Sequence, residues 1–247
     1  MGPTDNWVQI LLKKHSSIFT TILKREFERL PVFSLQNHLS LYIMNQKSLF
    51  EGDFQSPYNL LPKDGVVHYF ESFLDHRDSK AFHNKLLHNI DWRHDVLFMF
   101  GKKITTKRKV AWYGDKDISY TYSKVTKLST PWTEELLHLK KLVEEKTETN
   151  FNSCLLNLYH DGSEGMGWHR DNEKELKKNG TIASLSLGAE RRFCFKHTNT
   201  NDRVSINLGN GSLLIMKGES QAYWKHQLPP IKKILSSRIN LTFRTIA

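Results

Sequence analysis

Cysteine is scarce in this sequence of 247 residues, which contains only Cys154 and Cys194. Two cysteines cannot build the disulfide framework that holds small secreted domains together. Each lies in an apolar stretch with the character of a strand, so we expect two buried free thiols. The sequence therefore favours an intracellular, reducing compartment, either the cytoplasm of a bacterium or the nucleus of a eukaryote.

Long hydrophobic runs are also missing. No stretch of about 18 apolar residues occurs, so the sequence predicts no transmembrane helix and no membrane partner. Internal repeats and low-complexity segments are absent as well. With 38% hydrophobic residues the chain can bury one core of good size, and we expect a monomer built around a single main domain.

Acidic residues are few compared with basic ones, at 26 against 36, which gives a formal charge of +10. This excess favours a polyanionic partner, because Lys and Arg side chains that neutralise phosphates release counterions on binding. Residues 80–110 carry eight Lys or Arg against only Asp91 and Asp95. We expect nucleic acid at this segment, although a basic face that only contacts solvent would have the same charge.

Residues 1–56 form an N-terminal extension of uncertain role. Residues 7–43 have an amphipathic character with flanking Lys and Arg, as transit or anchoring segments do, but Asp5, Glu26 and Glu28 oppose a transit function. Met44 stands just before the more interpretable region and is a candidate start of translation.

Hydrophobic periodicity predicts a strand over residues 66–70 and then a helix with its apolar stripe between Phe73 and Leu87 and Ser79 as its cap. A second helix is expected over residues 134–146, with Pro131 in its first turn. The remaining pattern is that of short strands separated by turns, over residues 151–159, 182–187, 192–196, 204–208, 212–216 and 238–245. The sequence predicts a mainly β sandwich with flanking helices, in the α+β class.

His169 and Asp171 lie two positions apart, so in an extended segment both side chains point to the same side and can reach one ion. With His226 they make up two imidazoles and one carboxylate, the set that holds iron(II) on one face and leaves open positions for a co-substrate and oxygen. Alone, a His-x-Asp pair often occurs by chance in a surface loop, and the same three ligands also form catalytic zinc sites.

The segment that follows His226 opposes the zinc interpretation. From Arg238 to Arg244 polar and apolar residues alternate, so that Arg238, Asn240, Thr242 and Arg244 share one face of a strand. Two guanidinium groups near a metal suit a dicarboxylate, because the planar fork of Arg pairs with a carboxylate through two parallel hydrogen bonds.

Over residues 57–247 the sequence resembles the AlkB-type iron(II)/2-oxoglutarate dioxygenases, which oxidatively remove alkyl groups from nucleobases. The segments that carry this resemblance are Asn157-Leu-Tyr159, His169-Arg-Asp171, His226-Gln-Leu-Pro229 and Arg238-Ile-Asn240-Leu-Thr242-Phe-Arg244. Met99-Phe100-Gly101-Lys102, Trp112-Tyr113-Gly114-Asp115 and Tyr120-Thr-Tyr122-Ser123 more loosely resemble the branch that repairs double-stranded DNA.

The resemblance implies a double-stranded β-helix, or jelly-roll, dioxygenase core over residues 57–247 that includes a nucleotide-recognition region at about 92–130. Iron(II) would be bound by His169, Asp171 and His226. The 2-oxoglutarate site would comprise Asn157, Tyr159, Arg238, Asn240, Thr242 and Arg244, with Arg238 on the distal carboxylate. The implied reaction is demethylation of 1-methyladenine and 3-methylcytosine in DNA with molecular oxygen, coupled to decarboxylation of 2-oxoglutarate to succinate.

An enzyme of this kind must take its target base out of the duplex and needs a pocket for that base. Tyr120, Tyr122 and Ser123 are the candidates for the pocket. Glu173 could read an exocyclic amino group or be a solvated acid in a turn. Phe100 could be a wedge between bases or a core residue.

Contacts to the nucleic-acid backbone are predicted for Lys102, Lys103, Arg108, Arg191, Arg192 and Lys196. An RNA demethylase of the same family remains an alternative, since RNA offers phosphates and stackable bases too. A protein hydroxylase or an inert nucleic-acid-binding module is a third. The intact ligand set disfavours the inert module, and the basic, aromatic segment 96–124 disfavours the hydroxylase.

Overall fold

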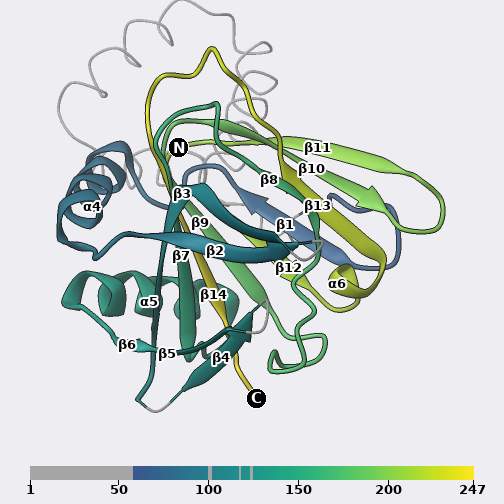
Figure 1. Cartoon of the computed structure of the whole chain (residues 1–247). Coiled ribbons are helices and arrows are strands. Elements are labelled where there is room, and N and C mark those ends of the chain that lie inside the picture. The colour runs from purple at the N-terminus through teal and green to yellow at the C-terminus, as the bar shows by residue number, and fades with distance from the viewer. Residues whose placement is uncertain (1–57, 100–101, 117, 123–124) are drawn as a thin grey trace, which may run out of the picture. The chain divides into compact units, whose positions relative to one another are not determined.

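The computed structural model describes residues 58–99, 102–116, 118–122 and 125–247 (Figure 1). The expectations for the N-terminal extension, Phe100 and Ser123 concern residues outside these ranges. Pro57–Ala247 forms one compact unit. Two antiparallel sheets and three helices make up most of its regular structure, as the alternating pattern predicted.

The larger sheet has the strand order β1-β12-β9-β14-β7-β3-β2, and the short strand β6 pairs in parallel with β3. In that order the strands are Val66–Phe70, Ser212–Lys217, Ile182–Gly188, Arg238–Arg244, Ser153–Tyr159, Lys102–Gly114 and Arg93–Met99, and β6 is Thr130–Pro131. Strands far apart in the sequence are neighbours in this sheet, which places β14 centrally between β9 and β7.

The smaller sheet has the order β11-β10-β13-β8. These strands are Arg203–Leu208, Arg191–His197, Trp224–Leu228 and Met166–His169. The one-turn helix α6, Ser220–Tyr223, leads directly into β13. A separate two-stranded ribbon joins β4, Ser119–Tyr122, to β5, Val125–Leu128.

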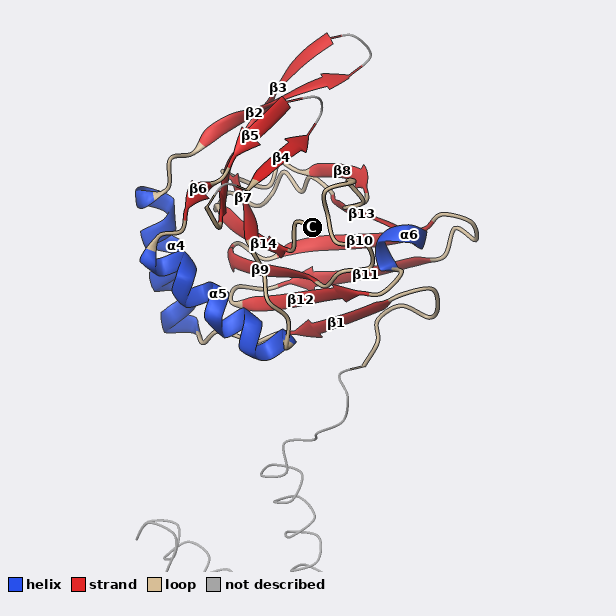
Figure 2. Cartoon of the chain, turned by 90° about the horizontal axis from the view of Figure 1, so that it is seen from below, coloured by secondary structure: helices blue, strands red, loops and turns tan. Residues whose placement is uncertain are grey.

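Helices α4, His76–Asn89, and α5, Glu134–Thr147, lie along one face of the larger sheet (Figure 2). The main hydrophobic core lies between these two helices and the larger sheet, and it contains Leu86, Leu139, Leu185 and Leu241. A second core joins the two sheets through residues such as Phe195 and Leu214. Because β14 sends its apolar residues to the helices, its polar residues must face the interior between the sheets.

Figure 2 also shows the β2–β3 hairpin projecting from one end of the sandwich, near the β4–β5 ribbon. Both lie within the predicted nucleotide-recognition region. The mainly β class and the jelly-roll arrangement predicted for the chain are thus confirmed.

The ends of the helices differ from the prediction. Asp75 caps α4, because its Oδ1 atom accepts a hydrogen bond from Asp78 N at 2.7 Å. Ser79, the predicted cap, lies buried inside the helix and accepts a hydrogen bond from Asn210. Pro131 lies in β6 rather than in the first turn of α5, which Thr133 caps. In both helices the side-chain oxygen of the cap accepts a hydrogen bond from the backbone N–H three residues later.

Candidate active site

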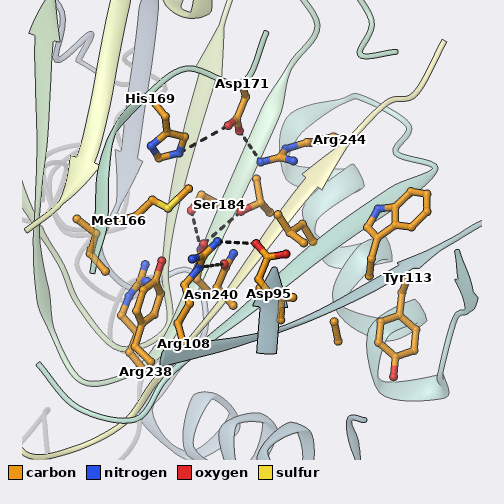
Figure 3. Close-up of a pocket in the computed structure, with 18 of the residues that line it drawn as sticks. Asp95, Arg108, Tyr113, Met166, His169, Asp171, Ser184, Arg238, Asn240 and Arg244 are labelled. Atoms are coloured by element: carbon orange, nitrogen blue, oxygen red, sulfur yellow. Dashed lines mark hydrogen bonds and ion pairs between the residues drawn. The ribbon is translucent and has the colours of Figure 1, made fainter. Parts of the chain in front are cut away.

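The three predicted metal ligands lie together. His169 ends β8 and stands opposite His226 on the neighbouring strand β13, while Asp171 follows two positions after His169. The Asp171 Oδ1 atom lies 3.8 Å from His169 Nε2 (Figure 3) and 3.9 Å from His226 Nε2. One ligand atom from each residue lies within 4.8 Å of the other two, so a single ion can bind all three.

Hydrogen bonds behind the ligands fix their orientation. His169 Nδ1 lies 2.8 Å from the carbonyl oxygen of Gly167, which assigns the proton to Nδ1 and leaves Nε2 as the metal donor. Helix α6 holds the intervening turn: Gln221 Oε1 accepts from Asp171 N at 3.0 Å, and Arg170 donates to the carbonyl oxygen of Ala222 at 2.6 Å. Arg170 therefore contacts α6 and not the metal ligands.

Electrostatics prepare this cluster for a cation. Burial alone would raise the pKa of the Asp171 carboxyl, but the charges of Arg244, His226 and His169 outweigh it and lower that pKa below its usual value. Burial, followed by the neighbouring His169, lowers the pKa of His226 to about 3. At neutral pH the site therefore holds a carboxylate and a neutral, buried imidazole. Metal binding requires these protonation states, and the donor set fits iron(II).

The polar face of β14 lies beside the cluster. Arg238, Asn240, Thr242 and Arg244 are all buried, and all four line one cavity of about 580 Å³ with the metal ligands. In the sheet, Arg238 stands opposite Tyr159 and Asn240 opposite Asn157, so strand register assembles the predicted co-substrate residues. Arg244 donates to Asp171 Oδ2 at 2.6 Å and so links the polar strand to the metal site.

Arg238 is a buried cation. It donates to Ser186 Oγ at 2.9 Å and its guanidinium group lies 5.6 Å from the centre of the Tyr159 ring. Burial lowers its pKa to about 10, so the side chain remains charged at neutral pH. Within the described ranges no carboxylate forms an ion pair with Arg238, and its Nε atom is buried without an acceptor. A bound carboxylate would supply the missing charge and acceptor.

Two of the residues predicted for the nucleic-acid backbone need correction. Arg108 is buried, donates to Asn157 Oδ1 at 3.0 Å and pairs with Asp95 at 3.1 Å. Arg191 is 1% exposed and donates to backbone carbonyl groups, among them that of Glu164 at 2.6 Å. Both guanidinium groups are used inside the protein, and we remove these residues from the predicted interface.

The other predicted nucleic-acid residues that the structure describes lie on β10, β3 and β4, apart from Glu173. On β10, Arg192 is exposed and Lys196 is half-buried. Lys102 and Lys103 belong to β3, and Tyr120 and Tyr122 to β4, where the backbone alone is described. Glu173 lines the cavity, and its Oε2 atom is buried with no hydrogen-bond partner among the residues described.

Sequence reasoning missed several residues of the site, including Asp95, Gln221, Ser184 and Ser186. The two serines had a readable signal, because they interrupt the apolar strand 182–187 at alternate positions and so share one face. Their hydroxyls accept from Asn240 Nδ2 at 2.8 Å and Arg238 Nη2 at 2.9 Å. Asp95 and Gln221 had none, since Asp95 meets Arg108 only through the pairing of β2 with β3, and Gln221 lies far from Asp171 in the sequence.

A jelly roll that carries two imidazoles and a carboxylate next to a buried arginine is an arrangement typical of non-haem iron oxygenases. Comparison with known sequences agrees. Residues 66–244 match the 2OG-Fe(II) oxygenase superfamily, and the chain belongs to it. Membership in this family confirms the predicted set of iron(II), 2-oxoglutarate and oxygen.

Curated relatives narrow the resemblance. The chain is 40% identical to the DNA oxidative demethylase ALKBH2 of Homo sapiens over 156 residues, and this matched segment covers 60% of each protein. It is 36% identical over 184 residues to the alpha-ketoglutarate-dependent dioxygenase alkB homolog 3 of Bos taurus, covering 70% of this chain and 64% of that one. These names confirm the AlkB-type resemblance. The chain spans less than two thirds of the length of these relatives.

Solved structures support the fold. The structure of OsALKBH1 superposes with a TM-score of 0.55 at 21% identity and covers 75% of this chain and 99% of that one. A prolyl hydroxylase from Trichoplax adhaerens, solved with a peptide fragment, gives a TM-score of 0.51 at 14% identity over 88% and 94%. Among the described residues, no helix is both long and apolar enough to cross a membrane.

Proposed function

We propose that this protein is an iron(II)/2-oxoglutarate-dependent dioxygenase that oxidatively demethylates alkylated bases in DNA, and so reverses the damage directly. The observation that carries the proposal is Arg238, a buried cation without a carboxylate partner in the described structure. Arg238 lines the same cavity as the metal ligands His169, Asp171 and His226. The relatives named as DNA oxidative demethylases support the substrate class.

The residues of the cavity would divide the work. Arg238 would hold the distal carboxylate of 2-oxoglutarate, while Asn157, Tyr159, Asn240, Thr242 and Arg244 complete its pocket. His169, Asp171 and His226 would hold iron(II), which with oxygen and 2-oxoglutarate supplies oxidative hydroxylation of the alkyl carbon, with succinate and carbon dioxide as products. The hydroxymethyl group then gives up its hydroxyl proton, the bond between its carbon and the base nitrogen breaks, and the carbon leaves as formaldehyde. The base nitrogen keeps the electron pair of that bond as its lone pair.

Glu173 is the candidate for reading the damaged base. Its carboxylate contributes to the cavity wall, and the buried Oε2 atom lacks a donor among the described residues. The exocyclic amino group of 1-methyladenine or 3-methylcytosine is a donor that would satisfy it. Tyr120, Tyr122 and Ser123 stay our proposal for the rest of the base pocket.

Nucleic acid would approach along the β2–β3 hairpin and β10. Lys102 and Lys103 begin β3, and Arg192 is exposed on β10, the strand that also carries Lys196. These four basic residues would contact phosphates, and Phe100 stays our proposal for the wedge. A reducing compartment fits this role, because both cysteines are buried free thiols. A monomer stays our proposal.

The assay that tests the proposal follows the release of formaldehyde and succinate. It compares one 1-methyladenine lesion in duplex DNA, in single-stranded DNA and in RNA of the same sequence, with an unmethylated duplex as the control. We expect turnover that requires iron(II), 2-oxoglutarate and the methyl group. A preference for the RNA would show that RNA, not DNA, is the substrate. Decarboxylation of 2-oxoglutarate without any dependence on the methyl group would contradict the proposed demethylation.

For Arg238→Lys we expect a rise of about tenfold or more in the 2-oxoglutarate concentration needed for half-maximal rate. Lysine keeps the positive charge but loses the planar fork, and in this buried site a compact ammonium cannot pair with both carboxylate oxygens. Affinity for nucleic acid should remain near that of the parent protein. Titration of 2-oxoglutarate at saturating DNA measures the effect, and an unchanged requirement would contradict the role of Arg238.

For Phe100→Ala we expect activity on a methylated duplex to fall much more than activity on the same lesion in a single strand. Only the duplex must be unstacked and held open, at a cost of a few kcal/mol. Lys102→Ala and Lys103→Ala are the matched controls, since loss of a phosphate contact should weaken both substrates and flatten the salt dependence. Equal losses on both substrates for Phe100→Ala would assign this residue to the core or the pocket.

A further inference from the structure

Arg108 connects the projecting hairpin to the co-substrate side of the cavity. Its guanidinium group reaches across from β3 to β7, where Nε donates to Asn157 Oδ1 at 3.0 Å. Another nitrogen, Nη2, lies 3.1 Å from Asp95 Oδ2 on β2. Arg108 is 6% exposed and Asp95 is 5% exposed, so this is a buried ion pair rather than a surface contact (Figure 3).

We propose that Arg108, held by Asp95, is a positioning residue that fixes the orientation of the Asn157 side-chain amide for 2-oxoglutarate. This inference rests on the proposed function, because it concerns the pocket in which 2-oxoglutarate would bind. It assigns a role to Asp95 and Arg108, two charged residues that are not among the metal ligands.

A primary amide has two chemically different ends. The side chain of Asn157 can present either its oxygen, an acceptor, or its NH₂ group, a donor, in a given direction. A guanidinium group has only donors, so the end that meets Arg108 must be the oxygen. Arg108 thereby leaves the NH₂ group as the part of Asn157 that can face an anionic ligand in the cavity.

Without Arg108 this choice would be lost. A flipped amide would turn its oxygen toward the carboxylate of the co-substrate, and two acceptors would then face each other. Asp95 has the complementary task of holding the guanidinium group in place and balancing its charge. An unbalanced Arg108 could itself turn toward a bound anion and leave Asn157.

Burial of Asn157 makes the orientation of its amide depend on Arg108. Asn157 is 7% exposed and stands opposite both Asn240 on β14 and Val110 on β3. Water has little access to replace a missing donor at this position, so the orientation of the amide depends on protein groups.

The experiment measures the dissociation constant of 2-oxoglutarate by calorimetry, with the full chain loaded with Mn(II) in the absence of oxygen. Binding is thus read without turnover. The variants are Arg108→Met, Asp95→Asn and the double variant Asp95→Asn/Arg108→Met. The double variant avoids leaving a buried carboxylate without its cation, so it answers the question if Arg108→Met does not fold. Arg93→Met is the matched control, an arginine of the same hairpin that is 79% exposed and paired with exposed Asp91.

We expect Arg108→Met and the double variant to raise the 2-oxoglutarate dissociation constant about tenfold, as befits a lost charge-assisted hydrogen bond. Asp95→Asn should raise it less, and Arg93→Met should leave it unchanged. Mn(II) affinity should stay within about twofold of the parent in every variant, because no metal ligand is altered.

Two results would overturn the inference, and they differ from a failure of the proposed function. If the parent protein binds 2-oxoglutarate and the double variant binds it equally well, Arg108 does not position Asn157. If Mn(II) affinity and 2-oxoglutarate affinity fall together, the pair only supports the fold. If the Mn(II)-loaded parent protein does not bind 2-oxoglutarate, the proposed function fails, and this inference fails with it.

Discussion

Asp171→Ala should abolish both iron binding and 2-oxoglutarate turnover. The carboxylate of Asp171 lies within 4 Å of a nitrogen of His169 and of His226, so its removal leaves two imidazoles that cannot hold the ion on one face. The substitution also removes the carboxylate that accepts a hydrogen bond from Arg244 at 2.6 Å. The positive charge of Arg244 would then repel a cation at this site. His169→Ala and His226→Ala should abolish turnover as well.

The measurement pairs Mn(II) affinity with succinate release, and it includes thermal unfolding to show that each variant is folded. Asn172→Ala is the matched control for Asp171→Ala, because Asn172 is the exposed next residue. It should keep metal affinity and turnover. Persistent iron-dependent turnover in a folded Asp171→Ala protein would refute the assignment of the metal site.

Arg191→Met should lower the free energy of unfolding by about 3 kcal/mol or more. The guanidinium group of Arg191 donates to the carbonyl oxygens of Glu164 at 2.6 Å and Pro229 at 3.1 Å, and more weakly to those of Asp161 and Gly162. One buried side chain thus ties the segment before β8 to the end of β13. Methionine fills a similar volume but leaves these carbonyl groups without donors.

Urea unfolding of the metal-free protein measures this effect, with Arg192→Met as the control. Arg192 is the adjacent residue on β10 but is exposed, so its replacement should change the unfolding free energy by less than about 0.5 kcal/mol. Affinity for nucleic acid should instead fall for Arg192→Met and stay unchanged for Arg191→Met, since Arg192 is the exposed residue of the two. Equal stability of the two variants would mean that Arg191 does not hold these segments together.

Local pattern was enough to predict much of this protein. Alternation of polar and apolar residues gave the strand 238–244 and the face that carries Arg238, Asn240, Thr242 and Arg244, because side chains on a strand alternate whatever the neighbours are. The two-residue spacing of His169 and Asp171 likewise placed both on one side. Helix ends were predicted less well: Ser79 was taken as a cap, although Asp75 occupies that position.

The sequence by itself determined the mainly β class and the short motifs of the site, since both follow from residue types at short, fixed spacings. The resemblance to a family added His226, which lies far from the other two metal ligands in the sequence. Only the tertiary structure decided how the arginines are used. Arg191 and Arg192 are adjacent, yet the pleat buries one and exposes the other, and burial converts a basic residue into an internal donor. Arg108 finds Asn157 and Asp95 because β3 lies between β7 and β2 in the sheet. Strand order is set by packing over the whole domain, and no local spacing encodes it.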